Sequence, residues 1–223
     1  MLKGINNQLE SYDGRDKILR LIGYTSYLVS GLTKNRALSR FGDSVSECRT
    51  ILRLLDDLPM LTHTLAYGLG RKEPDMHMQV CGVVVNILDQ LYYPLEHVAW
   101  AADRGLISLR SDHWWTASNA CWAFSLYFSI ARSLRYLSLL HNHSKHFDLS
   151  DANMREEFKK NQRLQLRELM SGVRSACDLA MAIHWMPDGF LWAGTLKEWH
   201  IGALGTLSTV LSLVQSCKSL QEL

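Results

Sequence analysis

The amino-acid sequence predicts an all-α fold: a helical membrane protein with an N-terminal amphipathic helix, a helical bundle and one or two membrane-spanning helices. Three observations lead to this fold class. Apolar residues recur every three or four positions along most of the chain, which is the spacing of an amphipathic helix. Only four of the 223 residues are proline, so few positions interrupt a helix. Two segments of 18 and 19 residues carry no charged side chain, close to the length of a bilayer span.

The first predicted element is an amphipathic helix over residues 13–36, for which Asp13 is a candidate N-cap. Lys17, Arg20 and Lys34 are expected opposite its apolar face. Such a helix can lie among lipid headgroups and wedge one leaflet, or it can pack into a bundle, and amphipathicity alone does not separate these alternatives. The residues predicted to insert into the membrane are Lys17, Ile18, Arg20, Leu21, Ile22, Leu28, Val29 and Leu32.

Two further helices are predicted over residues 43–58 and 75–102, separated by Pro59 and by a glycine-rich turn over residues 68–74. The second of these helices carries Asp89, Glu96 and His97 beside aromatic side chains. A polar cluster that holds helices together is the favoured interpretation, and proton transfer is the alternative.

Residues 114–131 form the first uncharged segment, a possible membrane span. Because this segment contains serine, threonine and asparagine, a core helix of a bundle remains an alternative. The polar residues 141–153 are the best candidate for a linker. A long helix is expected to follow, with a seam of apolar residues on which intramolecular packing is favoured over a coiled-coil dimer. The seam consists of Leu166, Leu169, Val173, Ala176, Ala180 and Ile183.

Residues 199–217 are the clearest candidate for a membrane span, with a buried core helix as the alternative. Trp199 and Lys218 suit the two interfaces of a bilayer. Small residues that allow close helix packing are Gly202, Gly205, Thr206 and Thr209.

The remaining composition argues against several classes of function. The net charge of +2 gives no field that would attract nucleic acid, and the five widely spaced cysteines predict free thiols in a reducing compartment. No phosphate loop, nucleophile elbow or paired-histidine metal motif occurs. The cluster His141, His143 and His146 is more typical of a solvated loop than of a metal site. We therefore expect no enzyme activity, no cofactor and no metal.

Several blocks of sequence resemble the peroxisomal membrane protein 11 family, and within it the gamma form. The most telling are Asp-Gln-Leu-Tyr-Tyr-Pro at 89–94 and Glu-His-Val-Ala-Trp-Ala-Ala-Asp at 96–103. Matching blocks occur in order along nearly the whole chain, at 9–12, 14–16, 48–54, 67–70, 114–115, 131–134, 184–187, 191–194 and 205–213.

The resemblance implies one domain over residues 1–223 in the peroxisomal membrane, with both termini in the cytosol. It implies elongation and remodelling of the membrane before fission, with membrane lipid, other copies of the chain, sister family members, fission adaptors and a dynamin-related GTPase as partners. Two alternatives remain open, a membrane pore for small metabolites and a soluble helical interaction scaffold.

Overall fold

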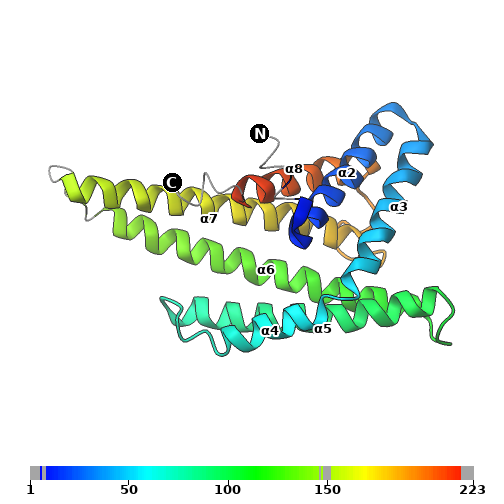
Figure 1. Cartoon of the computed structure of the whole chain (residues 1–223), viewed down its shortest axis with the longest axis horizontal. Coiled ribbons are helices and arrows are strands. Elements are labelled where there is room, and N and C mark those ends of the chain that lie inside the picture. The colour runs from blue at the N-terminus through cyan, green and yellow to red at the C-terminus, as the bar shows by residue number, and fades with distance from the viewer. Residues whose placement is uncertain (1–5, 7–8, 146, 148–151, 217–223) are drawn as a thin grey trace.

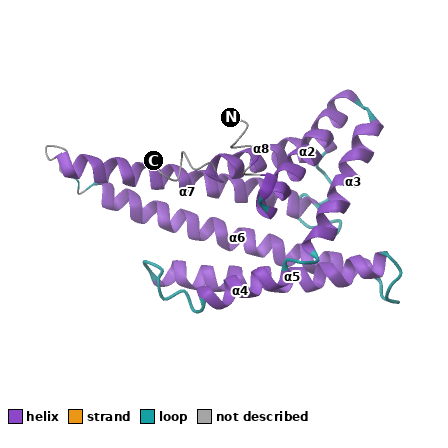
Figure 2. Ribbon diagram, viewed as in Figure 1, coloured by secondary structure: helices purple, strands orange, loops and turns teal. Residues whose placement is uncertain are grey.

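The computed structural model describes residues 6, 9–145, 147 and 152–216, and in this part of the chain every regular element is a helix (Figure 2). The all-α prediction is confirmed for these residues. The helices are α2 (Tyr12–Thr33), α3 (Arg36–Arg53), α4 (Asp57–Tyr67), α5 (Met76–Asp103), α6 (Ser111–Ser144), α7 (Ala152–His184) and α8 (Glu198–Ser216).

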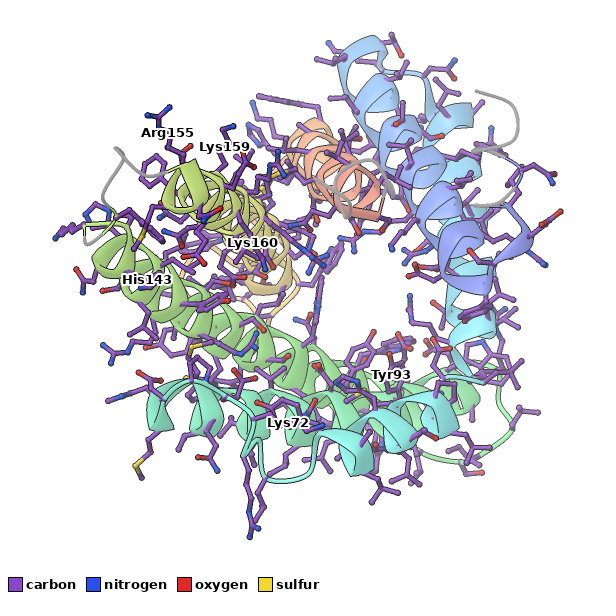
Figure 3. The ribbon with its side chains drawn as sticks, turned by 60° about the vertical axis from the view of Figure 1, so that its left-hand side comes forward. Lys72, Tyr93, His143, Arg155, Lys159 and Lys160 are labelled. Atoms are coloured by element: carbon purple, nitrogen blue, oxygen red, sulfur yellow. The ribbon has the colours of Figure 1, made fainter. Side chains whose placement is uncertain are left out.

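The helices are arranged as a curved single layer in which most of them have two principal neighbours. The main contacts run in the order α3, α2, α8, α7, α6, α5 and α4 (Figure 1). Seen from the side, the layer curves around an open centre, with α3 turning back toward α5 (Figure 3). Because neighbours lie at the sides of each helix, large parts of its other faces are left without a protein partner.

The first predicted helix ends earlier than expected. Helix α2 stops at Thr33 because Lys34 adopts a left-handed conformation with φ of 58°. Asn35 then caps α3, its side chain accepting a hydrogen bond from the Ala37 amide. Residues 34 and 35 therefore form the α2–α3 corner, and residue 36 begins α3 instead of completing the helix predicted over 13–36.

The second predicted helix is also displaced. It begins at Arg36 instead of 43 and ends at Arg53 instead of 58. Pro59 neither kinks nor ends it, because Pro59 lies in the first turn of α4, where a missing amide donor is tolerated.

The polar segment 141–153 is helical at both ends. Helix α6 continues to Ser144, and α7 begins at Ala152. No glycine or proline interrupts residues 141–144, so the helix has no local reason to end there. Residues 146 and 148–151, the centre of the predicted linker, lie outside the described residues.

Helix α7 turns its apolar seam outward over its first half, which contradicts the expected intramolecular packing. Leu166, Leu169 and Val173 are 54%, 52% and 40% exposed, although Ile183 farther along is buried. Polar contacts turn the helix this way. Asn161 donates to the Leu140 carbonyl at 3.0 Å on α6, and Asp178 pairs with Arg20 of α2. The side facing the other helices thus carries buried polar residues together with apolar ones such as Met181 and Ala182.

Candidate membrane-contacting surface

The described side chains include many buried polar groups and many exposed large apolar groups. More polar than apolar side chains are buried, including Glu96, Asn86 and Asp178. Large apolar side chains are exposed on every helix. The solvent-accessible area of 13907 Å² also exceeds the roughly 10,400 Å² that a compact chain of 25.5 kDa presents. Exposed apolar surface on this scale indicates contact with a partner or a membrane.

The residues predicted to insert from the first helix divide into three groups. Ile22, Val29 and Leu32 are exposed, at spacings of seven and three residues that place them on one side of α2, and we call them the α2 stripe. Ile18, Leu21 and Leu28 are half-buried, and the two basic residues face the interior.

The basic residues of α2 are held by other helices. Arg20 donates to Asp178 on α7 at 2.6 Å and to the Ser208 hydroxyl on α8 at 3.3 Å. Lys17 contacts Asp13 and the Ser216 hydroxyl on α8, the latter at 2.7 Å. These two cations therefore serve helix contacts in this structure instead of lying beside the apolar stripe.

Helices α2 and α8 run antiparallel and approach each other at glycines. A β-carbon on Gly202 would overlap the backbone of Leu28, one on Gly205 would overlap the Tyr24 ring, and one on Gly31 would lie 2.5 Å from the Trp199 nitrogen. The small residues predicted for close packing, Gly202 and Gly205, do form this contact. Close approach at small residues is the packing mode of helices that lack a hydrophobic driving force between them.

The other residues predicted for the second span lie on both sides of α8. Thr209 is fully buried and donates to the Gly205 carbonyl at 2.6 Å. The Thr206 hydroxyl is buried with no hydrogen-bond partner among the described residues. Lys218 lies outside those residues. The side away from α2 presents the α8 stripe, which consists of Leu207, Val210 and Val214, while Trp199 lies at the α2 contact beside Gly31.

Further apolar stripes, which the sequence analysis did not single out, lie on the α4–α5 side of the layer. Leu58, Leu61 and Leu65 follow one face of α4, with Leu65 73% exposed. Met76 and Val80 begin a similar line on α5 that continues to Ile87 and Leu91. Their helical spacing could have revealed them, although spacing does not show whether such a face is buried.

The carboxylate and imidazole predicted to cluster on one helix do so around a buried ion pair. Glu96 is 1% exposed and accepts hydrogen bonds from Arg53 at 2.5 and 2.9 Å and from the Tyr92 hydroxyl at 2.6 Å. His97 pairs with Asp57 of α4 at 3.1 Å. The cluster joins the α3–α4 corner to α5, which is the structural role favoured from the sequence.

Two polar side chains of segment 114–131 are engaged between helices. Ser125 donates to Asp89 of α5 at 2.5 Å, and Asn119 donates to the Ala182 carbonyl of α7 at 2.8 Å. Burial raises the pKa of the Asp89 carboxyl, and the Ser125 hydrogen bond opposes that rise. These residues join α6 to both of its neighbours.

Within the part of the chain that the structure describes, no helix has the length and apolar character needed to cross a bilayer. The same residues hold no group of three or more side chains suited to a metal ion. Of the predicted histidine cluster, His143 lies edge-on to Phe147 at the end of α6, on the same tip as Arg155 and Lys159 (Figure 3). His146 lies outside the described residues.

Comparison with known proteins decides the family. The family model for peroxisomal biogenesis factor 11 (PEX11) matches residues 2–217. The chain belongs to this family. It is 39% identical to human peroxisomal membrane protein 11C, over 98% of this chain and 95% of that protein. The mouse protein of the same name is 34% identical over the same shares.

A more distant PEX11 relative is the peroxisomal membrane protein PMP27 of Saccharomyces cerevisiae, 25% identical over 60% of this chain and 58% of that protein. No solved structure matches the chain. As a member of the PEX11 family, the chain is a peroxisomal membrane protein that acts in peroxisome biogenesis and proliferation. The family is one of membrane biogenesis factors, which agrees with the prediction of a non-enzymatic role.

Proposed function

We propose that this chain promotes peroxisome elongation and fission by embedding its apolar stripes in one leaflet of the peroxisomal membrane. The observation that carries the proposal is that large apolar side chains point outward on every helix, while polar side chains such as Glu96 and Asp178 are buried between helices. Side chains inserted into one leaflet expand that leaflet alone, and this imbalance favours curvature.

The α2 stripe is the proposed wedge. Ile22, Val29 and Leu32 are 40%, 38% and 65% exposed, so burying their exposed parts in lipid would stabilise the membrane-bound state by about 1 kcal/mol for each side chain. Lys17 and Arg20 are paired inside the layer, so the apolar residues, and not these cations, supply the attraction to the membrane.

The wedge is tested by replacing Ile22, Val29 and Leu32 together with serine in cells that carry a peroxisomal membrane marker. We expect the variant to reach peroxisomes without producing the elongation that the unaltered chain produces at high expression. Undiminished tubulation would refute the proposal. Leu21 and Leu28 are poorer targets, because Leu28 contacts Gly202 and its replacement would disturb the α2–α8 contact.

A matched control replaces exposed apolar side chains of the neighbouring helix α3 and the residues after it. Phe41, Ile51 and Leu55 are exposed to a similar extent, so their replacement by serine removes comparable apolar surface. If this control abolishes tubulation equally, the effect is a general loss of apolar surface and the assignment to α2 fails.

As an alternative to this one-leaflet arrangement, we propose that residues 199–217 span the bilayer, with 114–131 as a second span. Helix α2 packs along the length of α8, so it would then enter the bilayer together with α8. Support comes from the absence of Lys, Arg, Asp and Glu between 199 and 217 and from the glycine contacts of α8. Single cysteines introduced at Trp199 and Val214, in a chain lacking its native cysteines, test this span. Labelling of both from the cytosolic side by an impermeant maleimide would refute it.

Assignment to the gamma form is likewise a proposal, supported by the similarity to the human and mouse 11C proteins.

The proposed partners are other copies of the chain, sister family members, fission adaptors and a dynamin-related GTPase. Cross-linking of differently tagged copies in peroxisomal membranes tests self-association. Neither a pore nor a soluble scaffold is favoured, because Asn119 and Ser125, two of the polar residues of 114–131 that motivated a pore, are bonded between helices.

A further inference from the structure

A cavity of about 340 Å³ lies between α2, α3, the end of α7 and the start of α8. This volume is within the range of small-molecule sites in proteins. Its apolar wall includes Tyr24, Tyr27 and Trp185, and its charged wall consists of Arg20, Arg49, Asp43 and Glu198. Neither the family assignment nor membrane insertion accounts for this combination of aromatic rings and charges.

The two arginines of the wall are already neutralised. Arg20 pairs with Asp178 at 2.6 Å, and Arg49 makes a two-point contact with Asp16 at 2.8 and 3.0 Å. Among the described residues the two carboxylates of the wall form no ion pair. Asp43 accepts a hydrogen bond from the Tyr27 hydroxyl at 2.9 Å, and one buried carboxylate oxygen of Glu198, Oε1, has no hydrogen-bond partner. A ligand would therefore meet a net negative charge.

The carboxylates of Asp43 and Glu198 both influence the Tyr27 hydroxyl, so both lie near the same part of the cavity. Burial raises the pKa of the Tyr27 hydroxyl most, and the Asp43 hydrogen bond and the charges of Asp43 and Glu198 raise it further. Glycines hold the aromatic side chains in position. The Tyr27 ring lies against Gly42 and the Tyr24 ring against Gly205, where any larger residue would collide with them.

A second unpaired atom indicates what else a ligand would carry. The Arg20 Nε atom is buried and donates to no partner among the described residues. A buried donor without a partner is unfavourable, and so is a buried acceptor, so a molecule toward which Arg20 Nε and Glu198 Oε1 turn would gain from satisfying both.

We propose that this cavity binds an ammonium group that carries an oxygen acceptor a few bonds away, with the ammonium beside Asp43 and Glu198 and the oxygen at Arg20. Rings of tyrosine and tryptophan favour organic cations, and the carboxylates supply the opposite charge. Phosphocholine has this chemistry, either as a free molecule or as the headgroup of a phospholipid.

The test uses the full chain purified in a maltoside detergent, which has no ammonium group, and titrates phosphocholine by calorimetry. We expect saturable binding at one site that weakens at least tenfold in Glu198→Gln and in Asp43→Asn. Glu157→Gln, which removes an exposed carboxylate of α7 outside the cavity, is the matched control and should bind as the unaltered chain does. Thermal unfolding of each variant verifies that it is folded.

Two further arms distinguish the source and the charge of the ligand. The site is assigned to a lipid headgroup by the following result. The chain binds nanodiscs that contain phosphatidylcholine but not nanodiscs that contain only phosphatidylglycerol, and soluble phosphocholine does not bind. The binding to nanodiscs depends on Glu198 as described above. Equal binding of inorganic phosphate would show that the site recognises an anion and would overturn the proposal. Absence of binding in both the soluble and nanodisc arms, or full affinity in Glu198→Gln, would overturn it as well.

Discussion

The α2–α8 contact and the junction of α3 with α5 hold the same layer together by opposite means. At the first, glycines bring two backbones together over several turns, at Gly31, Gly202 and Gly205. At the second, a single buried ion pair, Arg53 with Glu96, joins the end of α3 to the middle of α5.

The difference concerns what each contact requires of its surroundings. Glycine packing depends on shape and dispersion, so it works equally well when the surrounding medium is apolar. A buried ion pair fixes one arrangement of the helices, but both of its charges have lost their hydration. Removing one partner therefore destabilises the fold strongly, because the other charge is left buried and unpaired. Shape therefore maintains α2 and α8 beside the proposed membrane surface, and charge sets where the α4–α5 part attaches.

The largest effect is expected from Gly202→Leu, because its side chain would collide with the Leu28 backbone, which cannot rotate away. We expect α2 to separate from α8 and the folded protein to be lost, a destabilisation of more than about 3 kcal/mol. Proteolysis and circular dichroism of the detergent-solubilised chain measure it. A variant that folds normally would show that the two helices do not need this approach.

The next effect is expected from Glu96→Ala, which leaves Arg53 without its carboxylate and removes the acceptor of Tyr92. The free energy of unfolding should fall by about 3 kcal/mol. Glu47→Ala is the matched control, because Glu47 pairs with Arg104 across the same junction at 3.3 Å while both are exposed. Glu47→Ala should lower the free energy of unfolding by less than about 1 kcal/mol. Equal losses in the two variants would refute the view that the buried ion pair matters more than the exposed one. Denaturant titration in detergent compares the two.

An intermediate effect is expected from Asp89→Asn. Because burial raises the pKa of Asp89, the folded chain holds its proton more tightly than the unfolded chain. The stability due to the neutral acid is therefore complete below the ordinary aspartate pKa, near 4, and is lost as pH rises through the raised value. The amide should stabilise the chain at neutral pH and flatten this pH dependence.

Unfolding followed as a function of pH measures this effect. Asp112→Asn, at an exposed position near the start of α6, serves as its control and should leave the pH dependence unchanged. If Asp89→Asn lowers stability at neutral pH, the ionised carboxylate contributes more to the Ser125 contact than its burial costs.

The smallest effect is expected from Gly172→Ala on α7. A β-carbon there would lie 3.7 Å from the Ser133 β-carbon, an ordinary packing distance. Since alanine loses less backbone entropy than glycine in a helix, the chain should gain about 0.5–1 kcal/mol. A rise in the thermal midpoint would verify this gain, and a fall would mean that α6 and α7 lie as close as α2 and α8.

Periodicity identified helices with apolar faces, but it could not decide what those faces meet. In α7 the spacing of the apolar seam predicted a packing surface. Contacts made by Asn161 and Asp178 instead turn the first half of the seam outward. The α2–α3 corner was missed for a different reason. Asn35 is a signal for a helix start, but no glycine or proline marks the end of α2, because Lys34 takes the left-handed conformation there.

The sequence by itself determined the all-helical class, the family, and the small residues of α8 that allow close packing. The helical class and the small residues follow from composition and spacing, which act within one helix, and the family follows from similarity to known proteins along nearly the whole chain. Only the tertiary structure decided that Lys17 and Arg20 face inward, that the α2 stripe remains uncovered, and that Asp43 and Glu198 line one cavity. The physical reason is that these features depend on which partners reach each face, and those partners lie up to about 200 residues away in the chain.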